Sequence, residues 1–335
     1  MNNTPAFIMP VKIAGNDLEL RLFREAVASI KRQTDPDWVI IMVDDYSNDQ
    51  RVYDVIDEMK AELKDKLHVL YNEKNFGSGV TRNKAVQYAS KIGAPFILFN
   101  DSDDVSDPKR LELVRKAFED PTVNVAYTSF VVIDQFDNPV PPEQINKSVK
   151  EITDGHQVDI VDGENAWITI VTKKKYTNLT SCTAVRTSLA VEEPFPIASV
   201  SEDSHTWVRY GAHPGKFRFI KEIKGGYRIC IGMQSRSRSV NVNFYEQMYK
   251  VDSAGFEAAL VVAKKYGTMG GWDENDLRCA FHVRLALSLI HGGSEEYCKA
   301  SLAESVAISK EKTLGYIDAL YCEPEFRARM KELVD

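Results

Sequence analysis

The sequence predicts an α/β protein with a mostly parallel central sheet, followed by a helical C-terminal segment. Three observations support this prediction. In the first third of the chain, short apolar runs alternate with segments whose apolar residues recur at helical spacing. Several of these apolar runs end in clusters of polar and acidic residues. From about residue 243 onward only helical periodicity remains. Strand and helix alternation is typical of a parallel sheet with helices on both faces.

The alternating segments fill the stretch from residue 6 to residue 101. The expected strands are 6–11, 38–45, 67–72 and 95–101, and the helices between them are 18–33, 49–64 and 79–93. Pro10 is expected to stop the first strand, because proline has no N–H to give to a sheet ladder. Gly93 is expected to cap the third helix at its C-terminus.

The later elements are less regular. The expected elements are a helix at 109–119, a strand at 125–134, a proline-rich loop at 135–144, a strand and turn at 182–191, a short helix at 201–213 with Ser201 as N-cap, and a strand–turn–strand unit at 217–231. Four helices follow at 244–266, 273–291, 295–311 and 313–333.

The change of pattern near residue 240 predicts two domains, 1–240 and 241–335. The apolar stripes of the second domain must be buried by packing on the first domain or by self-association, which makes a homo-oligomer one of the two alternatives.

Composition excludes several classes of protein. The 335 residues include 42 Lys and Arg against 49 Asp and Glu, a net charge of −7 that argues against a nucleic-acid binder. Five cysteines without a CxxC pair predict free thiols in a reducing cytosol. We see neither a transmembrane run nor a signal peptide, so the expected location is cytoplasmic, at most peripheral at the inner face of the membrane.

Polar clusters follow three of the expected strands, at 10–13, 44–49 and 100–104. Ligands of parallel sheets bind at the carboxyl ends of the strands, so chemistry is expected there. The cluster at 44–49 suits a base and a ribose, or an Asx-type turn that caps the next helix. In the cluster at 100–104, Asp101 and Asp103 can offer oxygen ligands to Mg²⁺ or Mn²⁺. The alternative is a solvated acidic turn before the helix at Pro108.

Three more segments are candidates for ligand binding or catalysis. The glycine-containing stretch 75–85 opens a helix, whose N-terminus favours phosphate, and carries Arg82. Segment 201–207 places two acids at the start of a helix. One of them could act as a general base, or both could only balance the positive end of the helix dipole. Segment 225–239 carries Arg228 and Arg236, which could hold a diphosphate or lie on a solvated hairpin edge.

In their order and spacing these motifs resemble the inverting family 2 glycosyltransferases with the GT-A fold, over roughly residues 5–240. The matching positions are "IMPV" at 8–11, the pair Asp44 and Asp45 with Ser47, the helix start Asn75, Gly77, Arg82 and Asn83, the acids Asp101, Asp103 and Asp104, the pair Glu202 and Asp203, and the turn Tyr227 and Arg228.

The resemblance implies an enzyme that moves a sugar from a nucleotide-diphosphate sugar, most simply a UDP-sugar, to a hydroxyl of a glycan or cell-surface polymer. It implies Mn²⁺ or Mg²⁺ held by Asp103 and Asp101, and Asp203 as the general base. The residues expected to contact the donor are Pro10, Val11, Asp44, Asp45, Arg82, Asp101, Ser102, Arg228 and Arg236.

The chain also departs from the family pattern. The first loop reads "PVKIAGND" at 10–17, where relatives often have "PVYN". Cys230 occupies the position where relatives often carry a histidine near the metal. We expect Cys230 not to bind the metal, because a soft thiolate does not suit a site of hard carboxylates. Two other functions remain as alternatives: a nucleotidyltransferase, and a sugar-nucleotide-binding protein without activity.

Overall fold

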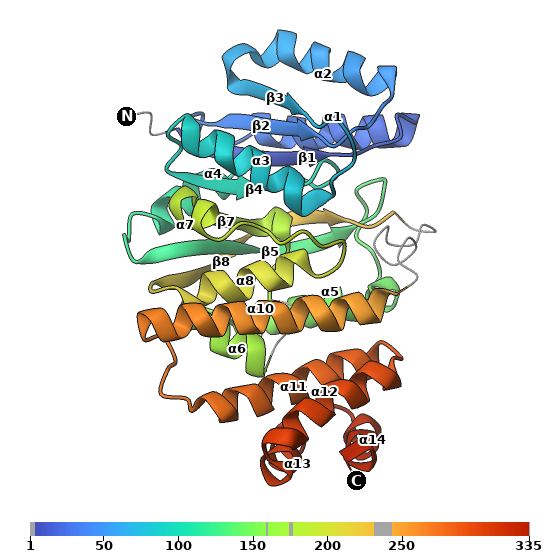
Figure 1. The fold of residues 1–335 in the computed structure, drawn as a ribbon. Helices are drawn as coiled ribbons and strands as arrows, with labels where there is room; N and C mark the ends of the chain where they lie inside the picture. Colours follow the sequence, from blue (N-terminus) through green and yellow to red (C-terminus); the bar gives the residue numbers. More distant parts are fainter. Residues whose placement is uncertain (1–3, 159, 174–176, 231–242, 335) are drawn as a thin grey trace. The chain divides into compact units, whose positions relative to one another are not determined.

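The computed structural model describes residues 4–158, 160–173, 177–230 and 243–334 (Figure 1). Contacts divide the chain into two compact units. The first, here called the sheet unit, comprises Met1–Asp162, Asn178–Ile197 and Lys216–Met233. The second, the helical unit, comprises Gly163–Thr177, Ala198–Gly215 and Gln234–Asp335. The predicted single boundary near residue 240 therefore differs from this division, because two earlier segments of the chain pack with the C-terminal helices.

The strands of the sheet unit form a mostly parallel sheet. They are β1 (Ala6–Val11), β2 (Val39–Asp44), β3 (Leu67–Tyr71), β4 (Phe96–Phe99), β5 (Val123–Ile133), β7 (Thr183–Arg186) and β8 (Lys216–Arg228), and they lie in the order β3-β2-β1-β4-β7-β5-β8. β7 is antiparallel to both of its neighbours, whereas the other pairs are parallel. β1 and β2 are apolar along most of their length because both faces of the sheet are covered.

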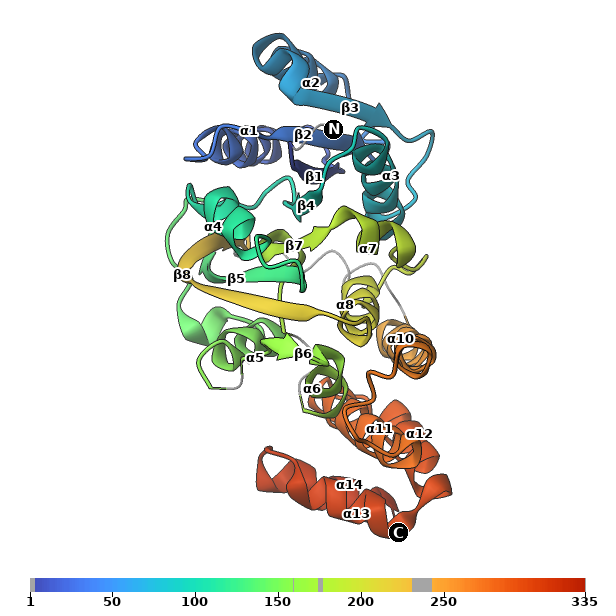
Figure 2. The same ribbon diagram turned by 90° about the vertical axis from the view of Figure 1, so that its left-hand side faces the viewer.

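Helices cover both faces of this sheet, and Figure 2 shows α1 and α4 on one side and α3 and α7 on the other. The helices of the unit are α1 (Asp17–Lys31), α2 (Gln50–Leu63), α3 (Ser78–Lys91), α4 (Arg110–Ala117), α5 (Lys147–Gly155) and α7 (Thr187–Glu192), with 3₁₀ turns at Lys64–Lys66, Pro142–Gln144 and Thr180–Cys182. The core between sheet and helices is built from buried side chains such as Phe7, Met9, Phe23, Ile40 and Met42. The alternation of strands and helices predicted for the first hundred residues is confirmed, with ends that differ by one or two residues.

Two details of the strands differ from the sequence prediction. β1 continues through Pro10, which pairs with Val43 of β2. On its other side β1 pairs with β4 only as far as Ile8, so no strand needs the missing N–H of Pro10. The segment 217–231 is a single strand up to Arg228 rather than strand, turn and strand, and an irregularity after Ile220 accommodates the extra residues.

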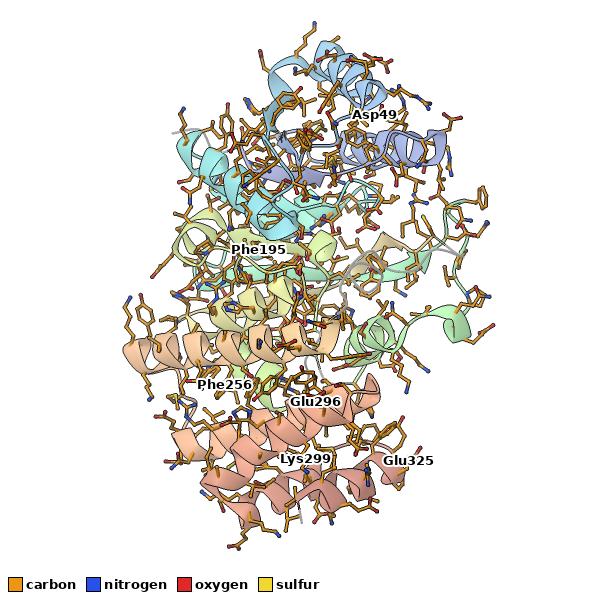
Figure 3. All side chains as sticks on the ribbon, turned by 45° about the vertical axis from the view of Figure 1, so that its right-hand side comes forward. Asp49, Phe195, Phe256, Glu296, Lys299 and Glu325 are labelled. Atoms are coloured by element: carbon orange, nitrogen blue, oxygen red, sulfur yellow. The ribbon has the colours of Figure 1, made fainter. Side chains whose placement is uncertain are left out.

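The helical unit contains the remaining elements. They are the short strand β6 (Gly163–Glu164) and the helices α6 (Ala166–Thr172), α8 (Glu202–Ala212), α10 (Phe244–Tyr266), α11 (Glu274–His291), α12 (Glu295–Ile308), α13 (Lys310–Ala319) and α14 (Pro324–Val334). Phe256 of α10, labelled in Figure 3, stacks on Phe281 of α11 with ring centroids 4.2 Å apart. The expected helix at 313–333 is divided into α13 and α14, because Pro324 opens a new helix.

The five cysteines are free thiols, as predicted. In the part of the chain that the structure describes, the helices are all too short or too polar to cross a membrane.

Gly211 lets α8 lie directly against the start of α6. A Cβ added to Gly211 would come within 2.6 Å of the backbone nitrogen and 3.1 Å of the Cα of Trp167. Because both atoms belong to the backbone of a packed helix, neither can move aside cheaply.

We therefore expect Gly211→Ala to destabilise the protein by roughly 1–3 kcal/mol, the usual range for overpacking. Gly315→Ala in α13 is the matched control, because no atom lies within 4 Å of its added Cβ. In that open helical position alanine should stabilise by roughly 0.5–1 kcal/mol. Thermal unfolding of both variants checks the prediction, and equal melting temperatures would contradict it.

Candidate donor-binding site

The first two polar clusters of the sequence meet at the carboxyl edge of the sheet, where β1 lies between β2 and β4. The backbone N–H of Asp45 donates to the carbonyl of Val11 at 2.7 Å. The N–H of Ile13 donates to Ser47 Oγ at 3.2 Å, and the N–H of Ser47 donates to the Asp44 carboxylate at 3.2 Å. The turn after β2 therefore folds against the unusual first loop of the chain, and Asp44 shapes that turn.

Asp45 fixes the start of α3. Its buried carboxylate accepts hydrogen bonds from Asn72 Nδ2 at 2.8 Å and from the N–H groups of Phe76 and Gly77, both at 2.9 Å. Gly77 has φ +86°, a conformation that few other residues adopt readily. The carboxylate thus holds the segment that leads into α3, in addition to any contact with a nucleoside that the sequence predicts.

Arg82 of α3 reaches the acidic loop after β4. Its Nη2 donates to Asp101 Oδ1 at 2.8 Å, and the Arg82 side chain is only 5% exposed, against 32% for Asp101. The backbone N–H of Asp101 donates to Ser181 Oγ at 2.9 Å. This ion pair joins two of the sequence motifs and leaves the Asp101 carboxylate partly open to solvent.

The neighbouring acids Asp103 and Asp104 have opposite surroundings. Asp103 is exposed, whereas Asp104 is buried and accepts a hydrogen bond from the backbone N–H of Arg228 at 2.8 Å. Burial, together with the charges of Asp103 and Asp101, raises the pKa of Asp104 well above its usual range. Ser102, which lies between Asp101 and Asp103 in the sequence, is also buried. Of these two neighbouring acids, Asp103 is the one placed to meet a ligand, and Asp104 belongs to the support of the loop.

Two buried arginines donate hydrogen bonds to the acidic loop, residues 100–104, and to the end of β4 from the interior of the protein. Arg110 donates to Asn100 Oδ1 at 3.4 Å and to the carbonyls of Phe99 and Thr183 at 2.9 and 3.1 Å. Burial lowers the pKa of Arg110 to about 10, so it stays charged at neutral pH. The role of Arg110 was not predicted from the sequence, where its local signal is an arginine in the first turn of the helix after the acids.

Arg228 is the second buried arginine. Its Nε donates to the carbonyl of Asp103 at 2.8 Å, and its Nη1 to the carbonyl of Asp134 at 2.8 Å. The same guanidinium pairs with Asp137 at 2.7 Å and with Glu25 at 3.3 Å. The side chain has no exposed surface. The structure thus differs from the expected diphosphate contact, because the donors of Arg228 are engaged by the protein. Arg236 lies outside the described residues.

The donor set around the acidic loop suits a hard cation with few protein ligands. Asp101 and Asp103 offer carboxylate oxygens, the ligand type that Mg²⁺ and Mn²⁺ prefer. Among the described residues, no three His, Cys, Asp or Glu side chains gather closely enough to hold a metal by themselves. Cations of this kind often take one or two carboxylates and complete their shell with phosphate oxygens and water. The residues present fit such a site.

Glu202 and Asp203 open α8 in the helical unit, outside the group of strand ends just described. The N–H of Ser204 donates to Asp203 Oδ1 at 2.7 Å. Ser201 precedes the helix as predicted, but it has φ +57° and its side chain makes no capping bond. Cys230 lies beyond the end of β8 rather than inside the strand that the sequence predicts.

Comparisons with known proteins agree with this geometry. An uncharacterized glycosyltransferase of Methanocaldococcus jannaschii is 28% identical over 214 residues, which cover 62% of this chain and 66% of that protein. The UDP-Glc:alpha-D-GlcNAc-diphosphoundecaprenol beta-1,3-glucosyltransferase of Escherichia coli is 29% identical over 108 residues, 32% of this chain and 40% of that protein. The matches thus span less than two thirds of either relative.

Solved structures share the fold. TarS 1–349 of S. aureus, in complex with UDP-GlcNAc, gives a TM-score of 0.55 at 16% identity and covers 96% of this chain and 93% of that one. A mannosyltransferase of Pyrobaculum calidifontis, in complex with GDP-Man and Mn²⁺, gives 0.54 at 15% identity, covering 100% of this chain and 85% of that one. The architecture is therefore the GT-A fold with C-terminal helices. The family model for glycosyl transferase family 2 matches residues 8–178, about half of the chain, and this chain belongs to that family.

Proposed function

We propose that this glycosyltransferase moves a hexose, with inversion, from a nucleotide-diphosphate sugar to a hydroxyl of a glycan or cell-surface polymer. The observation that carries the proposal is the carboxyl edge of β1, β2 and β4, where the Arg82–Asp101 ion pair lies among the acidic strand ends. UDP is the proposed nucleotide. The Escherichia coli relative is described with a UDP-sugar and TarS was solved with one, whereas the mannosyltransferase was solved with a GDP-sugar. The free thiols favour a cytoplasmic location.

The proposed donor contacts lie along this edge. Pro10, Val11 and Asp44 would line the nucleoside pocket, since they lie at the carboxyl ends of β1 and β2. Arg82 would add positive charge near the start of α3, where the helix N-terminus also favours phosphate. Asp101, oriented by Arg82, would accept a hydrogen bond from the ribose.

Asp103, with Asp101, would hold the divalent cation beside the diphosphate. The cation, when bound, would act as a Lewis acid that stabilises the leaving diphosphate. Arg228 is proposed as a positioning residue, because its guanidinium holds the carbonyl of Asp103 from the buried side of the loop. The orientation of the exposed Asp103 carboxylate would then depend on a side chain that never meets the donor.

Asp203 is the proposed general base. Its carboxylate would take the proton from the acceptor hydroxyl while that oxygen forms a bond to the anomeric carbon. The bond from the anomeric carbon to the diphosphate breaks in the same step, and the nucleotide leaves with the electron pair. A single displacement of this kind inverts the anomeric centre.

Asp103→Ala should abolish the gain in UDP affinity that Mn²⁺ provides, because the cation loses its main protein ligand. Calorimetric titration with UDP, with and without Mn²⁺, measures this gain. We expect a loss of about tenfold or more, equivalent to about 1.4 kcal/mol. Asp57→Ala, an exposed acid on α2, is the control and should leave the gain unchanged. An unchanged gain in Asp103→Ala would remove this residue from the metal site.

Asp203→Asn should lower the turnover by roughly 10²-fold or more, the lower part of the range for general-base catalysis. UDP affinity should stay near that of the natural protein, because the amide keeps the shape of the side chain. Release of UDP from a panel of UDP-sugars, with short glycans as acceptors, measures turnover. Glu202→Gln is the matched control from the same helix turn. A large loss in Glu202→Gln with normal turnover in Asp203→Asn would transfer the role to Glu202.

Arg228→Met should destabilise the protein by about 3 kcal/mol, near the lower end for breaking a buried ion pair, because Glu25 and Asp137 are partly exposed. Arg228→Lys restores the charge but not the forked geometry, so rescue should be partial. Arg24→Met, from an exposed pair with Glu58, should change stability by less than about 1 kcal/mol. Urea unfolding and UDP titration separate the two roles: weaker UDP binding at unchanged stability would favour a direct diphosphate contact.

A further inference from the structure

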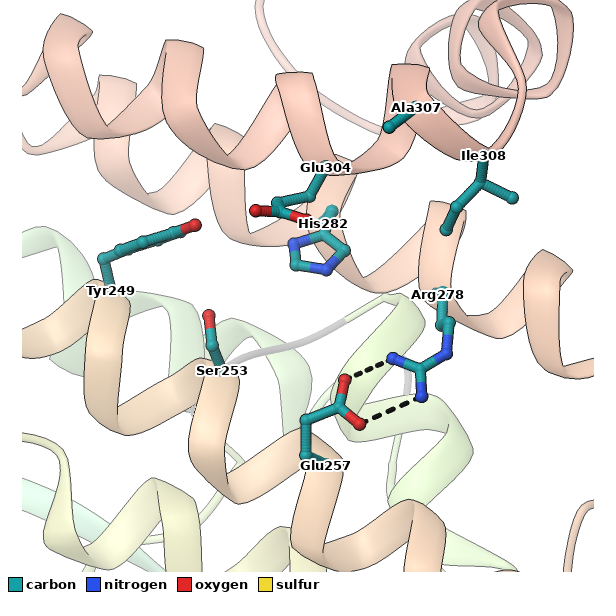
Figure 4. Close-up of a pocket in the computed structure, with 8 residues that line it drawn as sticks. All are labelled: Tyr249, Ser253, Glu257, Arg278, His282, Glu304, Ala307 and Ile308. Carbon is teal, nitrogen blue, oxygen red and sulfur yellow. Dashed lines mark hydrogen bonds and ion pairs between the residues drawn. The ribbon is translucent and has the colours of Figure 1, made fainter.

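The helical unit contains a groove that the proposed reaction does not use. It lies between α10, α11 and α12 and has a volume of about 400 Å³ (Figure 4). This volume falls in the range of about 300–1,000 Å³ that is typical of small-ligand sites. The lining residues are Tyr249, Ser253, Glu257, Arg278, His282, Glu304, Ala307 and Ile308. Six of these eight side chains end in a polar group.

The positive charge of the groove is already neutralised. Arg278 forms a two-point ion pair with Glu257, in which the Nη2–Oε2 distance is 2.9 Å (Figure 4). Arg278 also donates to Glu274 from Nε at 3.1 Å and from Nη2 at 3.0 Å. Since this guanidinium faces two carboxylates, it offers little attraction to a further anion.

His282 brings a neutral imidazole to the centre of the groove. The Ser301 hydroxyl donates to the carbonyl of His282 at 2.8 Å and lies 3.4 Å from Nδ1. This arrangement favours a hydrogen on Nδ1 and a lone pair on Nε2. Burial lowers the pKa of His282 to about 4, so the ring is uncharged at neutral pH. Within the described part of the chain, no hydrogen-bond donor reaches Nε2.

The other lining groups are suited to hydroxyl ligands. Tyr249 offers a phenol and a ring face, and Figure 4 shows its hydroxyl directed toward the groove. Ser253 Oγ is buried and has no hydrogen-bond partner among the described residues. Glu304 on α12 adds an exposed carboxylate, whose charge contributes to the raised pKa of Tyr249. Ala307 and Ile308 supply an apolar edge.

We propose that this groove binds a neutral sugar unit of a glycan, with His282 Nε2 and Glu304 accepting hydrogen bonds from its hydroxyls and the Tyr249 ring lying against its apolar face. A sugar needs many acceptors and donors together with some apolar surface, and the lining provides this combination. An inorganic or organic anion would be repelled by the negative charge of Glu304. The proposal rests on the proposed function, because it makes the groove a holding site for the acceptor glycan.

Binding to the full chain can be measured by saturation-transfer difference NMR. The probes are glucose, N-acetylglucosamine, mannose, maltotriose and chitotriose, with spermidine and inorganic phosphate as a cation and an anion. At least one of the sugars should bind. His282→Ala should weaken this binding about tenfold, equivalent to about 1.4 kcal/mol, and Glu304→Gln should weaken it by a smaller factor. Glu296→Gln, an exposed acid on the same helix outside the groove, is the matched control and should have no effect.

Glu304 is exposed, so Glu304→Gln is expected to fold even if His282→Ala does not. The proposal is overturned if no sugar binds, if the variants and the control bind sugar alike, or if only spermidine or phosphate responds to Glu304→Gln. UDP titration of the same variants separates this proposal from the proposed function. If the natural protein does not bind UDP, the proposed UDP donor is overturned and the groove is unaffected. If UDP binds normally and no sugar binds, the groove proposal alone is overturned.

Discussion

The contacts of the buried Arg228 guanidinium are the interaction on which the acidic loop at the carboxyl edge of the sheet depends. It connects the carbonyl of Asp103 to Glu25 of α1 and to the turn at Asp134 and Asp137. Its own backbone N–H donates to the buried carboxylate of Asp104. Burying a guanidinium costs free energy unless carboxylates and carbonyls surround it, and here they come from three separate segments of the chain. The last residue of β8 therefore supplies the contacts that hold the acidic loop.

This arrangement divides neighbouring residues into two groups by burial. Asp45 and Asp104 use their carboxylates inside the protein, whereas Asp101 is partly exposed and Asp103 is exposed. The Asp45 carboxylate accepts three N–H groups and that of Asp104 accepts one, and burial limits the access of a ligand to both. The motif "NDSDD" thus contains both a buried acid that supports the loop and acids that stay accessible at its surface, and only the packing around each residue separates them.

The sequence was sufficient to predict the sheet and the edge at which its polar strand ends meet. Apolar runs such as 38–45 and 95–101 are strong local signals, and the order of a parallel sheet brings their ends together without further information. The role of Arg228 could not be predicted in this way. Its partner Glu25 lies 203 positions away, and no local pattern reports such a pair. The same reason explains why the boundary near residue 240 does not describe the packing: segments 163–177 and 198–215 join helices that follow much later in the chain.

The two units thus carry different kinds of binding chemistry. The edge of the sheet unit is rich in carboxylates, and the ion pair between Arg82 and Asp101 lies beside them with Asp101 partly exposed. Such an arrangement favours a divalent cation together with a diphosphate. The groove of the helical unit has paired charges, a neutral histidine and two hydroxyl groups, which favours uncharged polar ligands. A glycosyltransferase needs both kinds, since its donor is a charged nucleotide sugar and a glycan acceptor can be uncharged. The difference between the two surfaces follows from the surroundings of one arginine in each unit. Arg228 is buried and holds the loop that carries Asp103 at the surface. Arg278 is paired with Glu257, which neutralises its charge in the groove.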